Sequence, residues 1–420
     1  MNIALYPPEN LSLLLSLPAS KSISNRALII SALSGMDATK CNSFLQNISD
    51  CDDTTVMLKA LQHPSPVVDI MAAGTAMRFL SAYYSVTPGC RTITGTERMR
   101  HRPIAVLVEA LRLLGAEVEY AGKEGFPPLR ISGTCKKGRK LELPGNISSQ
   151  YISALLMIGP TLEGGLILRL TGEIVSRPYI DMTLHIMQKF GASVQWTDAC
   201  TIEVGQGGYS PKNYYIENDW SAASYWYEMV ALTPDEHAEV ILPGLFKESL
   251  QGDCAVENLF GQLGVKTEHF CNEEGLPCIR LTKSDNIANR IEYNLVNQPD
   301  LAQTLVTTCV LMQIPFRFTG LQSLKIKETD RIAALRTELR KLGFDIQEEQ
   351  DCTLFWNGET CPKEPSPSID TYDDHRMALA LAPACFKFHG LCIREAQVVS
   401  KSYPQYWQHL KDAAFIINKL

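Results

Sequence analysis

The feature that most constrains the fold of this 420-residue chain is an internal repeat. Helix-like apolar segments end four times at a Leu-Gly or Phe-Gly step and then continue into a short β-like run. The glycines are Gly115, Gly191, Gly264 and Gly343, which are 76, 73 and 79 residues apart. A glycine just past a helix often takes the left-handed conformation that ends the helix. The regular spacing therefore predicts several copies of one structural unit.

A second set of helical segments runs in phase with the first. These segments begin at small or polar residues and are apolar around nearly their whole circumference, which predicts burial on all sides. Short β-rich runs separate the two kinds of helix, at 92–95, 166–171, 239–243 and 290–295. Each unit is thus predicted to be mixed α/β, with two helices and four strands. The buried segments are expected at 22–34, 73–84, 148–158, 219–232, 299–312 and 373–386.

Six such units fit the length, three in each of two lobes. The last unit lacks its closing strands, because the chain ends after residues 403–419. The strand-like residues 3–5 and 11–17 are expected to supply them. The chain then starts in the second lobe, crosses near Pro18 and returns near Asn218. The predicted lobes are an N-terminal lobe over 19–218 and a C-terminal lobe built from 1–18 and 219–420.

Composition excludes several classes of protein. With 45% hydrophobic and 20% charged residues, the chain has the make-up of an ordinary globular protein. No run approaches the roughly 20 apolar residues of a transmembrane helix, so no membrane partner is expected. The net charge of −7 argues against a nucleic-acid partner. The 13 cysteines include no C-x-x-C pair, which indicates neither a disulfide framework nor a zinc site, and we expect a cytoplasmic protein.

The starts of the buried helices are candidate anion sites. Their unpaired N–H groups and helix dipoles favour negative charge, although each polar residue there also suits an ordinary N-cap. Cations gather near these starts or in loops, which predicts a site for more than one anion. Arg98 and Arg100 also fit solvated surface charge. The polar residues are Ser22, Gly74, Thr75, Ser148, Ser149, Ser221, Asp300 and 373–375, and the other cations are Lys21, Arg26, Arg78, Arg102, Lys325, Lys327, Arg331, Arg376 and Lys401.

Carboxylates in the same segments are candidate acids and bases. Glu328 lies among opposite charges just before a helix, which suits a proton donor. A capping box that begins at Thr329 is the alternative. Asp373, Asp374 and His375 lack the partner ligands that a metal site needs. The motifs of P-loop kinases, dinucleotide-binding dehydrogenases, zinc hydrolases and serine hydrolases are absent from the sequence.

Eight short motifs resemble, in order, those of the 5-enolpyruvylshikimate-3-phosphate synthase family. They include Lys21-Ser-Ile-Ser-Asn-Arg26, Lys327-Glu-Thr-Asp-Arg331 and Lys401-Ser-Tyr-Pro404. The resemblance implies an α/β fold of two lobes, each with three repeated β/α units and buried parallel helices. This is the two-lobed inside-out α/β barrel of the enolpyruvyl transferases. The motifs occupy 17–26, 73–78, 98–104, 148–150, 176–181, 327–331, 374–377 and 401–404.

The resemblance also implies a reaction of the shikimate pathway, which leads to chorismate and the aromatic amino acids. The enolpyruvyl group of phosphoenolpyruvate is transferred to the 5-hydroxyl of shikimate 3-phosphate, and inorganic phosphate is released. Both substrates carry phosphate and carboxylate, so a cation-rich cleft that closes over them would offset their repulsion and expel water. No metal or organic cofactor is implied. A monomer that glyphosate inhibits is expected.

Roles of single residues follow from the same resemblance. Asp300 is expected to accept the proton of the 5-hydroxyl, Glu328 to deliver a proton to the methylene carbon, and Lys21 to assist catalysis. The residues expected to bind shikimate 3-phosphate are Lys21, Ser22, Arg26, Ser148, Ser149, Gln150, Ser176, Tyr179, Asp300, Ser323 and Lys327. The residues expected to bind phosphoenolpyruvate are Lys21, Gly74, Arg102, Gln150, Arg331, His375, Arg376 and Lys401.

Some positions depart from the family pattern. Asn is usual at three of them and Arg at another, and the linker between the lobes usually reads Glu-Gly-Asp. Ser323 weakens the case for one contact to shikimate 3-phosphate, and the bulky Trp220 is expected to alter hinge motion. The departures are Ala72, Ser323, Lys325, Asp373, Asn218 and Trp220.

Two other functions remain open from the sequence. A sister transferase that acts on a UDP-sugar should carry a reactive Cys after the start of the third unit, and should lack Ser148-Ser149-Gln150. A non-catalytic relative that only binds anions should have lost Lys21, Asp300 or Glu328, and all three are present. Transfer to shikimate 3-phosphate is therefore the preferred interpretation.

Overall fold

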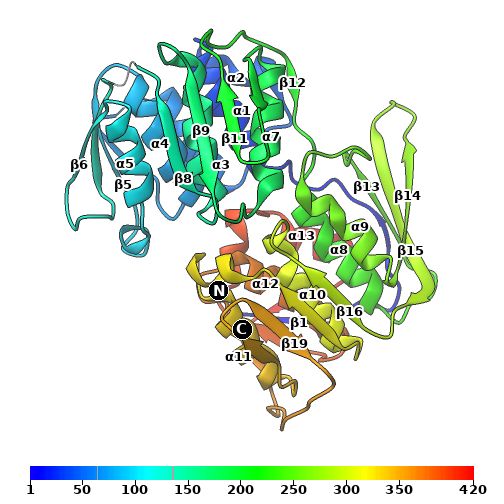
Figure 1. Ribbon diagram of the computed structural model, residues 1–420. Helices are drawn as coiled ribbons and strands as arrows, with labels where there is room; N and C mark the ends of the chain where they lie inside the picture. Colours follow the sequence, from blue (N-terminus) through cyan, green and yellow to red (C-terminus); the bar gives the residue numbers. More distant parts are fainter. Residues whose placement is uncertain (64, 135–136) are drawn as a thin grey trace. The chain divides into compact units, whose positions relative to one another are not determined.

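The chain forms two compact units (Figure 1). The computed structural model describes residues 1–63, 65–134 and 137–420. Unit 1 contains Met1–Pro18 and Glu217–Leu420, and unit 2 contains Ala19–Ile216.

The boundary after unit 2 falls two residues before the predicted one, so Glu217 and Asn218 lie in unit 1. Hydrogen bonds within unit 1 explain this placement. The Asn218 backbone N–H donates to the carbonyl of Gly244 at 2.9 Å, and its side-chain amide donates to the carbonyl of Pro243 at 2.8 Å. Both residues are buried, so these bonds tie the segment to unit 1.

Among the described residues, five sheets share one topology. In each, the first strand pairs in parallel with the second, the second pairs antiparallel with the fourth, and the fourth pairs antiparallel with the third. In the sheet at the end of the chain, the N-terminal strand takes the place of the fourth strand. In unit 2 the strands of the two full sheets are β4 (Val67–Asp69), β5 (Cys90–Thr94), β7 (Leu129–Ser132) and β6 (Glu117–Tyr120), then β8 (Lys140–Pro144), β9 (Leu166–Thr171), β11 (Thr201–Val204) and β10 (Val194–Trp196). A reduced sheet pairs β3 (Leu45–Gln46) in parallel with β12 (Tyr214–Tyr215).

Unit 1 contains the other three of these sheets. Their strands are β2 (Ser12–Leu14), β13 (Glu239–Pro243), β15 (Pro277–Ile287) and β14 (Leu263–Cys271); β16 (Ile291–Asn294), β17 (Phe316–Thr319), β19 (Thr353–Trp356) and β18 (Gln347–Glu349); and β20 (Ser368–Ile369), β21 (Leu391–Ile393), β1 (Ile3–Tyr6) and β22 (Ile416–Lys419).

The two N-terminal strands enter different sheets, which corrects one prediction. β1 completes the last sheet between β21 and β22, with Ile3 opposite both Ile393 and Lys419. β2 instead pairs in parallel with β13, with Ser12 opposite Glu239. In the other two repeats within unit 1, a strand that pairs in parallel directly precedes the buried helix. The chain that precedes residue 217 is already paired within unit 2, so the segment around β2 supplies that strand.

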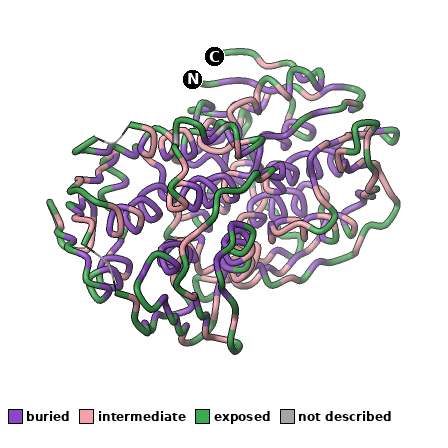
Figure 2. Tube along the Cα trace, turned by 90° about the horizontal axis from the view of Figure 1, so that it is seen from above, coloured by how far each residue is buried: buried purple, intermediate pink, exposed green. Residues whose placement is uncertain are grey.

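Two kinds of helix are present, as predicted, and they alternate from residue 52 onward. All ten residues of α10 (Ala302–Leu311) are buried, whereas α5 (Ala105–Leu113) buries one stripe that includes Leu107, Val108 and Leu111. Buried residues are purple in Figure 2. The buried helices are α1 (Lys21–Leu33), α4 (Gly74–Val86), α6 (Ser149–Ile158), α8 (Trp220–Leu232), α10 (Ala302–Leu311) and α12 (His375–Leu381). The others are α2 (Cys41–Phe44), α3 (Asp52–Gln62), α5 (Ala105–Leu113), α7 (Arg177–Lys189), α9 (Val256–Phe260), α11 (Arg331–Lys341) and α13 (Tyr406–Asp412).

Three of the four repeating glycines end helices, as predicted. Gly115, Gly191 and Gly343 follow α5, α7 and α11 with φ of 91°, 89° and 101°. Gly264 does not end a helix, because α9 stops at Phe260. It lies in β14 with φ of 79°, where the register with β15 shifts. A β-bulge uses a left-handed glycine in the same way as a helix end, so the sequence pattern alone does not separate the two.

None of the helices in the described part of the chain has both the length and the apolar character that a membrane span requires.

Candidate active site

The first turns of the buried helices in unit 2 carry most of the residues predicted for that lobe. Ser148 caps α6 by accepting the N–H of Gln150 at 3.4 Å. The Gln150 side chain in turn donates to the hydroxyl of Thr75 at 3.1 Å, which joins the first turns of α6 and α4. Ser149 is buried, at 8% exposure. These contacts place hydroxyl and amide groups together at helix N-termini, where anions bind favourably.

Arg26 holds the helices of unit 2 together. Its guanidinium is buried and donates to Thr183 at 2.6 Å, to Ser153 at 3.1 Å and to the carbonyl of Tyr179 at 3.2 Å. It also bonds the carbonyl of Ser22 at 2.9 Å. Burial lowers the pKa of Arg26 to about 10, and Tyr179 opposes this shift. Arg26 therefore links α1, α6 and α7 through protein groups, in addition to its predicted role toward substrate.

Lys21 opens α1 and lies at a partly exposed position. Its Nζ is 3.6 Å from Oδ2 of Asp53 in α3, and its side chain is 18% exposed. Ser22 beside it is also half-buried. The Lys21 ammonium therefore lies beside Asp53 while part of its side chain stays accessible to solvent.

Gly74 and Arg102 are in close contact. A Cβ on Gly74 would lie 2.5 Å from Nη1 of Arg102. The carbonyl of Gly74 accepts a hydrogen bond from Arg78 at 3.0 Å, and Arg78 also donates to the carbonyl of Pro103 at 3.3 Å. The Tyr151 hydroxyl donates to the same carbonyl at 2.5 Å. The loop that carries Arg102 is thus tied to α4 and α6.

Ser176 precedes α7 with a φ of 55°, in the left-handed region. A non-glycine residue there costs of order 1 kcal/mol and tends to occur at functional sites. Ser176 is buried, and its side chain does not cap the helix. The hydroxyl of this strained residue therefore does not stabilise the start of α7. Tyr179 is the third residue of α7.

In unit 1, Arg331 is the centre of a carboxylate cluster. It is 1% exposed and donates to Asp374 at 2.8 and 3.2 Å. Further bonds reach Asp300 at 3.1 Å and Glu328 at 2.9 Å. Burial alone would lower the pKa of Arg331, but Asp374, Glu328 and Asp300 together raise it. Removal of one member of such a buried group typically costs 3–5 kcal/mol.

A second arginine meets the same cluster. Nη2 of Arg376 lies 2.9 Å from Oδ2 of Asp300, and Nη1 bonds the backbone carbonyl of Asp300 at 3.3 Å. Nζ of Lys327 is 3.7 Å from Oδ1 of Asp300. Burial lowers the pKa of Lys327, and the charge of Asp300 opposes that shift. The predicted base Asp300 is thus surrounded by three cations.

The remaining predicted residues of unit 1 lie at or near the start of α12. His375 is its first residue and is 2% exposed, with Nδ1 3.7 Å from Oδ1 of Asp374. Asp374 is the N-cap and accepts the N–H of Arg376 at 3.0 Å. The Lys401 ammonium donates to the carbonyl of Asp373, which has a φ of 54°.

Two positions that depart from the family pattern lie in the 3-10 turn Gln322–Ile326. Lys325 pairs with Glu348 at 2.9 Å and with Asp351, outside the Arg331 cluster. Ser323 makes no contact with the cluster among the hydrogen bonds of the described residues. The N-cap of α11 is Asp330, which accepts the N–H of Ala333 at 3.1 Å. The proposed capping box at Thr329 is therefore wrong by one residue, and the cap does not involve Glu328.

The bulky Trp220 is accommodated inside unit 1. It is fully buried, and its indole N–H donates to Glu217 at 2.7 Å. The Trp220 backbone N–H donates to the side chain of Gln251 at 3.2 Å. The linker substitution therefore adds a buried anchor rather than an exposed aromatic ring.

Sequence reasoning missed Asp253, in the 3-10 turn Gly252–Ala255. Asp253 is 3% exposed and accepts the hydroxyl of Ser221, which also accepts a bond from Arg376 at 3.4 Å. Burial, followed by the charge of Asp300, raises the pKa of Asp253 to about 7. The signal was the Gln251-Gly-Asp253 step, whose small and polar residues resemble an ordinary loop.

Arg331 occupies the middle of the carboxylates of Asp374, Asp300 and Glu328. Within the described ranges, no three His, Cys, Asp or Glu side chains are grouped to hold a metal ion.

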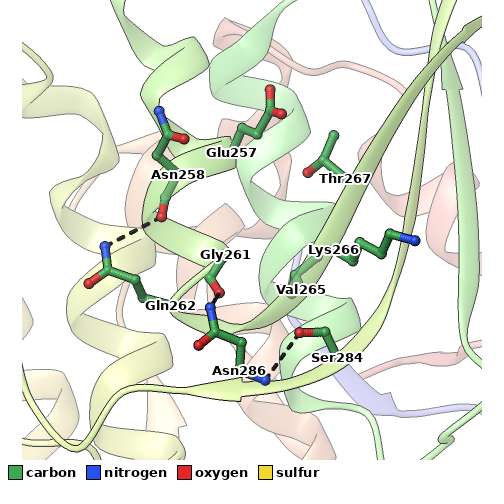
Figure 3. A pocket seen from close by; sticks show the side chains of 9 residues that line it. All are labelled: Glu257, Asn258, Gly261, Gln262, Val265, Lys266, Thr267, Ser284 and Asn286. Atoms are coloured by element: carbon green, nitrogen blue, oxygen red, sulfur yellow. Dashed lines mark hydrogen bonds between the residues drawn. The ribbon is translucent and has the colours of Figure 1, made fainter.

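A cavity of about 360 Å³ lies elsewhere in unit 1, beside α9, β14 and β15 (Figure 3). Its walls include the side chains of Asn258, Gln262 and Asn286. None of the predicted site residues lines it. The cavity is therefore separate from the cluster around Arg331.

Comparisons with known proteins place the chain in a family. A model of EPSP synthase (3-phosphoshikimate 1-carboxyvinyltransferase) matches residues 5–410. A 3-phosphoshikimate 1-carboxyvinyltransferase of Bacteroides fragilis (strain YCH46) is 56% identical over 415 residues, which are 99% of this chain and 98% of the relative. The enzyme of the same name from Shewanella pealeana is 36% identical over 441 aligned positions, covering 98% and 99%.

Solved structures show the same fold. An EPSP synthase from Acinetobacter baumannii matches with a TM-score of 0.76 and 20% identity over 100% of both chains. The enolpyruvyl transferase NikO from Streptomyces tendae matches with a TM-score of 0.71 and 13% identity over 99% of this chain and 98% of that one. The predicted two-lobed inside-out α/β architecture is confirmed, and the chain belongs to the EPSP synthase family.

Proposed function

We propose that this protein transfers the enolpyruvyl group of phosphoenolpyruvate to the 5-hydroxyl of shikimate 3-phosphate and releases inorganic phosphate. Relatives that are named 3-phosphoshikimate 1-carboxyvinyltransferase cover nearly the whole chain at up to 56% identity. The observation that carries the proposal is the cluster around Arg331. Acid, base and anion-binding groups converge there: Glu328 and Asp300 both bond Arg331, and Arg376 bonds Asp300.

In unit 2, hydroxyls and cations at helix starts suit a phosphorylated, hydroxyl-rich substrate. Arginine binds phosphate through paired donors, and helix N–H groups add partial positive charge. We assign shikimate 3-phosphate to this set, with Lys327, Asp300 and Ser323 of unit 1 as further contacts. The unit 2 residues are Lys21, Ser22, Arg26, Ser148, Ser149, Gln150, Ser176 and Tyr179.

Phosphoenolpyruvate carries a phosphate and a carboxylate, so it needs several cations. The bonds that Arg331 makes to carboxylates use four of its five N–H groups and leave one on Nη1 for a substrate oxygen. His375 is the first residue of α12, and Lys401 bonds the carbonyl of Asp373 just before that helix. The set assigned to phosphoenolpyruvate is Lys21, Gly74, Arg102, Gln150, Arg331, His375, Arg376 and Lys401.

The chemistry needs one base and one acid. Asp300 takes the proton of the 5-hydroxyl while the hydroxyl oxygen bonds to the central carbon of phosphoenolpyruvate. Glu328 protonates the methylene carbon. The product of this addition is a tetrahedral ketal phosphate. The Glu328 carboxylate then takes a proton back from the methyl group, which restores the double bond while the carbon–oxygen bond to phosphate breaks and phosphate leaves. Lys21 offsets the charge that develops on the oxygens.

Further properties follow from the same assignment. We expect a cytoplasmic monomer. We also expect glyphosate to inhibit it, because glyphosate is a small anion that would compete for the cationic residues assigned to phosphoenolpyruvate. Light scattering of the purified protein tests the monomer.

Phosphate release from phosphoenolpyruvate, measured with and without shikimate 3-phosphate, tests the function. Release that requires shikimate 3-phosphate supports the proposal. Release that requires a UDP-sugar instead would assign the chain to the sister activity. If neither acceptor promotes release while both substrates bind, the protein is an anion-binding relative.

A further inference from the structure

Helix α11 contacts the segment before α12 at two points. At its start, Arg331 bonds Asp374 at 2.8 and 3.2 Å. Near its end, Glu338 and Lys341 bond residues 368–372. Arg331 and Glu338 are seven residues apart, which is two helical turns and places them on the same face. One helix therefore holds both ends of a short connection that leads into the candidate active site.

Glu338 is the main anchor at the far end. Its side chain is fully buried, yet it accepts several hydrogen bonds, as a buried carboxylate must. The Tyr372 hydroxyl donates to Oε1 at 2.5 Å, and the backbone N–H of Asp370 donates to Oε2 at 3.0 Å. Lys341 is 2.7 Å from Oε2. Glu338 thus bonds both the backbone and a side chain of the connection.

Lys341 extends this network. Its ammonium bonds Oδ2 of Asp370 at 2.7 Å and the carbonyl of Ser368 at 3.1 Å. The other oxygen of Asp370 accepts a bond from Arg394 at 3.0 Å. The start of the connection is therefore fixed by ionic and hydrogen bonds on both sides.

The part between the two anchors is conformationally strained. Tyr372 and Asp373 are consecutive non-glycine residues with φ of 54° each. Such residues persist only where the surrounding structure holds them. The Glu338 bond to the Tyr372 side chain and the Arg331 bonds to Asp374 lie on either side of Asp373, so they restrain this conformation.

Three residues assigned to phosphoenolpyruvate depend on the strained pair. His375 and Arg376 follow it directly at the start of α12. Lys401 bonds the carbonyl of Asp373. A change in the backbone of residues 372–373 would move all three groups, whereas the unit 2 residues assigned to shikimate 3-phosphate lie in other segments.

We propose that Glu338 and Tyr372 are positioning residues: their hydrogen bond holds the strained turn at 372–373, and thereby places His375, Arg376 and Lys401 for phosphoenolpyruvate. This inference rests on the proposed function. Neither side chain is proposed to contact substrate. Loss of the bond between Glu338 and Tyr372 should therefore weaken the binding of phosphoenolpyruvate and leave the binding of shikimate 3-phosphate nearly unchanged.

Tyr372→Phe tests the inference, because it removes the hydroxyl and keeps the ring. The matched control is Tyr227→Phe, which removes a hydroxyl that bonds Thr267 at 2.8 Å elsewhere in unit 1. Loss of one hydrogen bond to a charged group corresponds to about a tenfold change in an equilibrium constant. We expect about a tenfold rise in KM for phosphoenolpyruvate in Tyr372→Phe, with KM for shikimate 3-phosphate within twofold of wild type and the control unchanged in both.

A second variant, Glu338→Gln, should reproduce the selective rise in KM, and Tm is measured for all variants. An equal rise in both KM values, or a lower Tm with no change in either KM, would overturn the positioning role. Wild-type turnover is an independent readout: wild type that releases no phosphate with both substrates refutes the proposed function. Calorimetric titration of phosphoenolpyruvate into wild type and Tyr372→Phe then still tests the positioning role, which equal affinities would refute.

Discussion

Gly74→Ala should move the guanidinium of Arg102. The added Cβ would be 2.5 Å from Nη1, 3.0 Å from Cζ and 3.1 Å from Nη2 of that side chain, whereas ordinary contact begins at 3.4 Å. The guanidinium must therefore withdraw by about 0.9 Å, the difference between 3.4 and 2.5 Å. Because Arg102 is a flexible side chain, we expect it to shift while the backbone of α4 stays in place.

The magnitude follows from how sensitive catalysis is to position. A misplacement of about 1 Å can reduce the rate by up to about 100-fold. We expect kcat/KM for phosphoenolpyruvate to fall by roughly 10- to 100-fold, and glyphosate inhibition to weaken, because both anions are assigned to Arg102. The assay is steady-state phosphate release at varied phosphoenolpyruvate, with and without glyphosate.

Two controls separate this mechanism from a general loss of structure. Gly122→Ala in the same unit should be neutral, because its Cβ would meet only Cδ of Pro128 at 3.4 Å. In an Arg102→Ala background, Gly74→Ala should have little further effect, because the side chain that it displaces is gone. Additive losses in the double variant, or unchanged glyphosate inhibition in Gly74→Ala, would refute the reasoning.

Three further predictions concern carboxyl groups of unit 1. Glu328→Gln should lower kcat by at least about 100-fold with little change in substrate affinity, as expected for a proton donor. Equal losses in kcat and in substrate affinity would make Glu328 a binding residue. The pKa of Asp253 is raised to about 7 from the ordinary 3.8, so the protonated carboxyl favours the folded state. This contribution to stability is fully present below pH 3.8 and is lost as the pH rises through 7. Denaturant titrations should therefore show Asp253→Asn gaining stability over wild type across that range, by up to about 4 kcal/mol, and a constant difference would contradict the shift. Burial also raises the pKa of Glu228 well above its ordinary 4.5, so Glu228→Gln should gain about 1.4 kcal/mol relative to wild type for each pH unit above 4.5 until the carboxyl ionises; identical slopes in the two proteins would show that Glu228 is not held neutral.

Much of the fold follows from local sequence pattern. Residues 151–158 of α6 are apolar except for Ser153, and this identified a helix buried on all sides, because no polar face is available for solvent. Gly115, Gly191 and Gly343 marked helix ends because the left-handed conformation is easiest for glycine. The resemblance to the family assigned Arg331, Asp300 and Glu328 to the same reaction, and Asp300 and Glu328 both contact Arg331.

Tertiary structure decided what depends on partners far along the chain. The sequence shows that residues 11–17 suit a strand, but the choice of β13 as the partner of β2 depends on which sheet has an unpaired edge. Gly264 suits both a helix end and a bulge, and its pairing with β15 selects the bulge. Asp253 lies in an ordinary loop pattern and gains its chemical interest only from burial beside Asp300. Local conformational preference is a property of adjacent residues, whereas pairing, burial and charge environment arise only once distant segments meet.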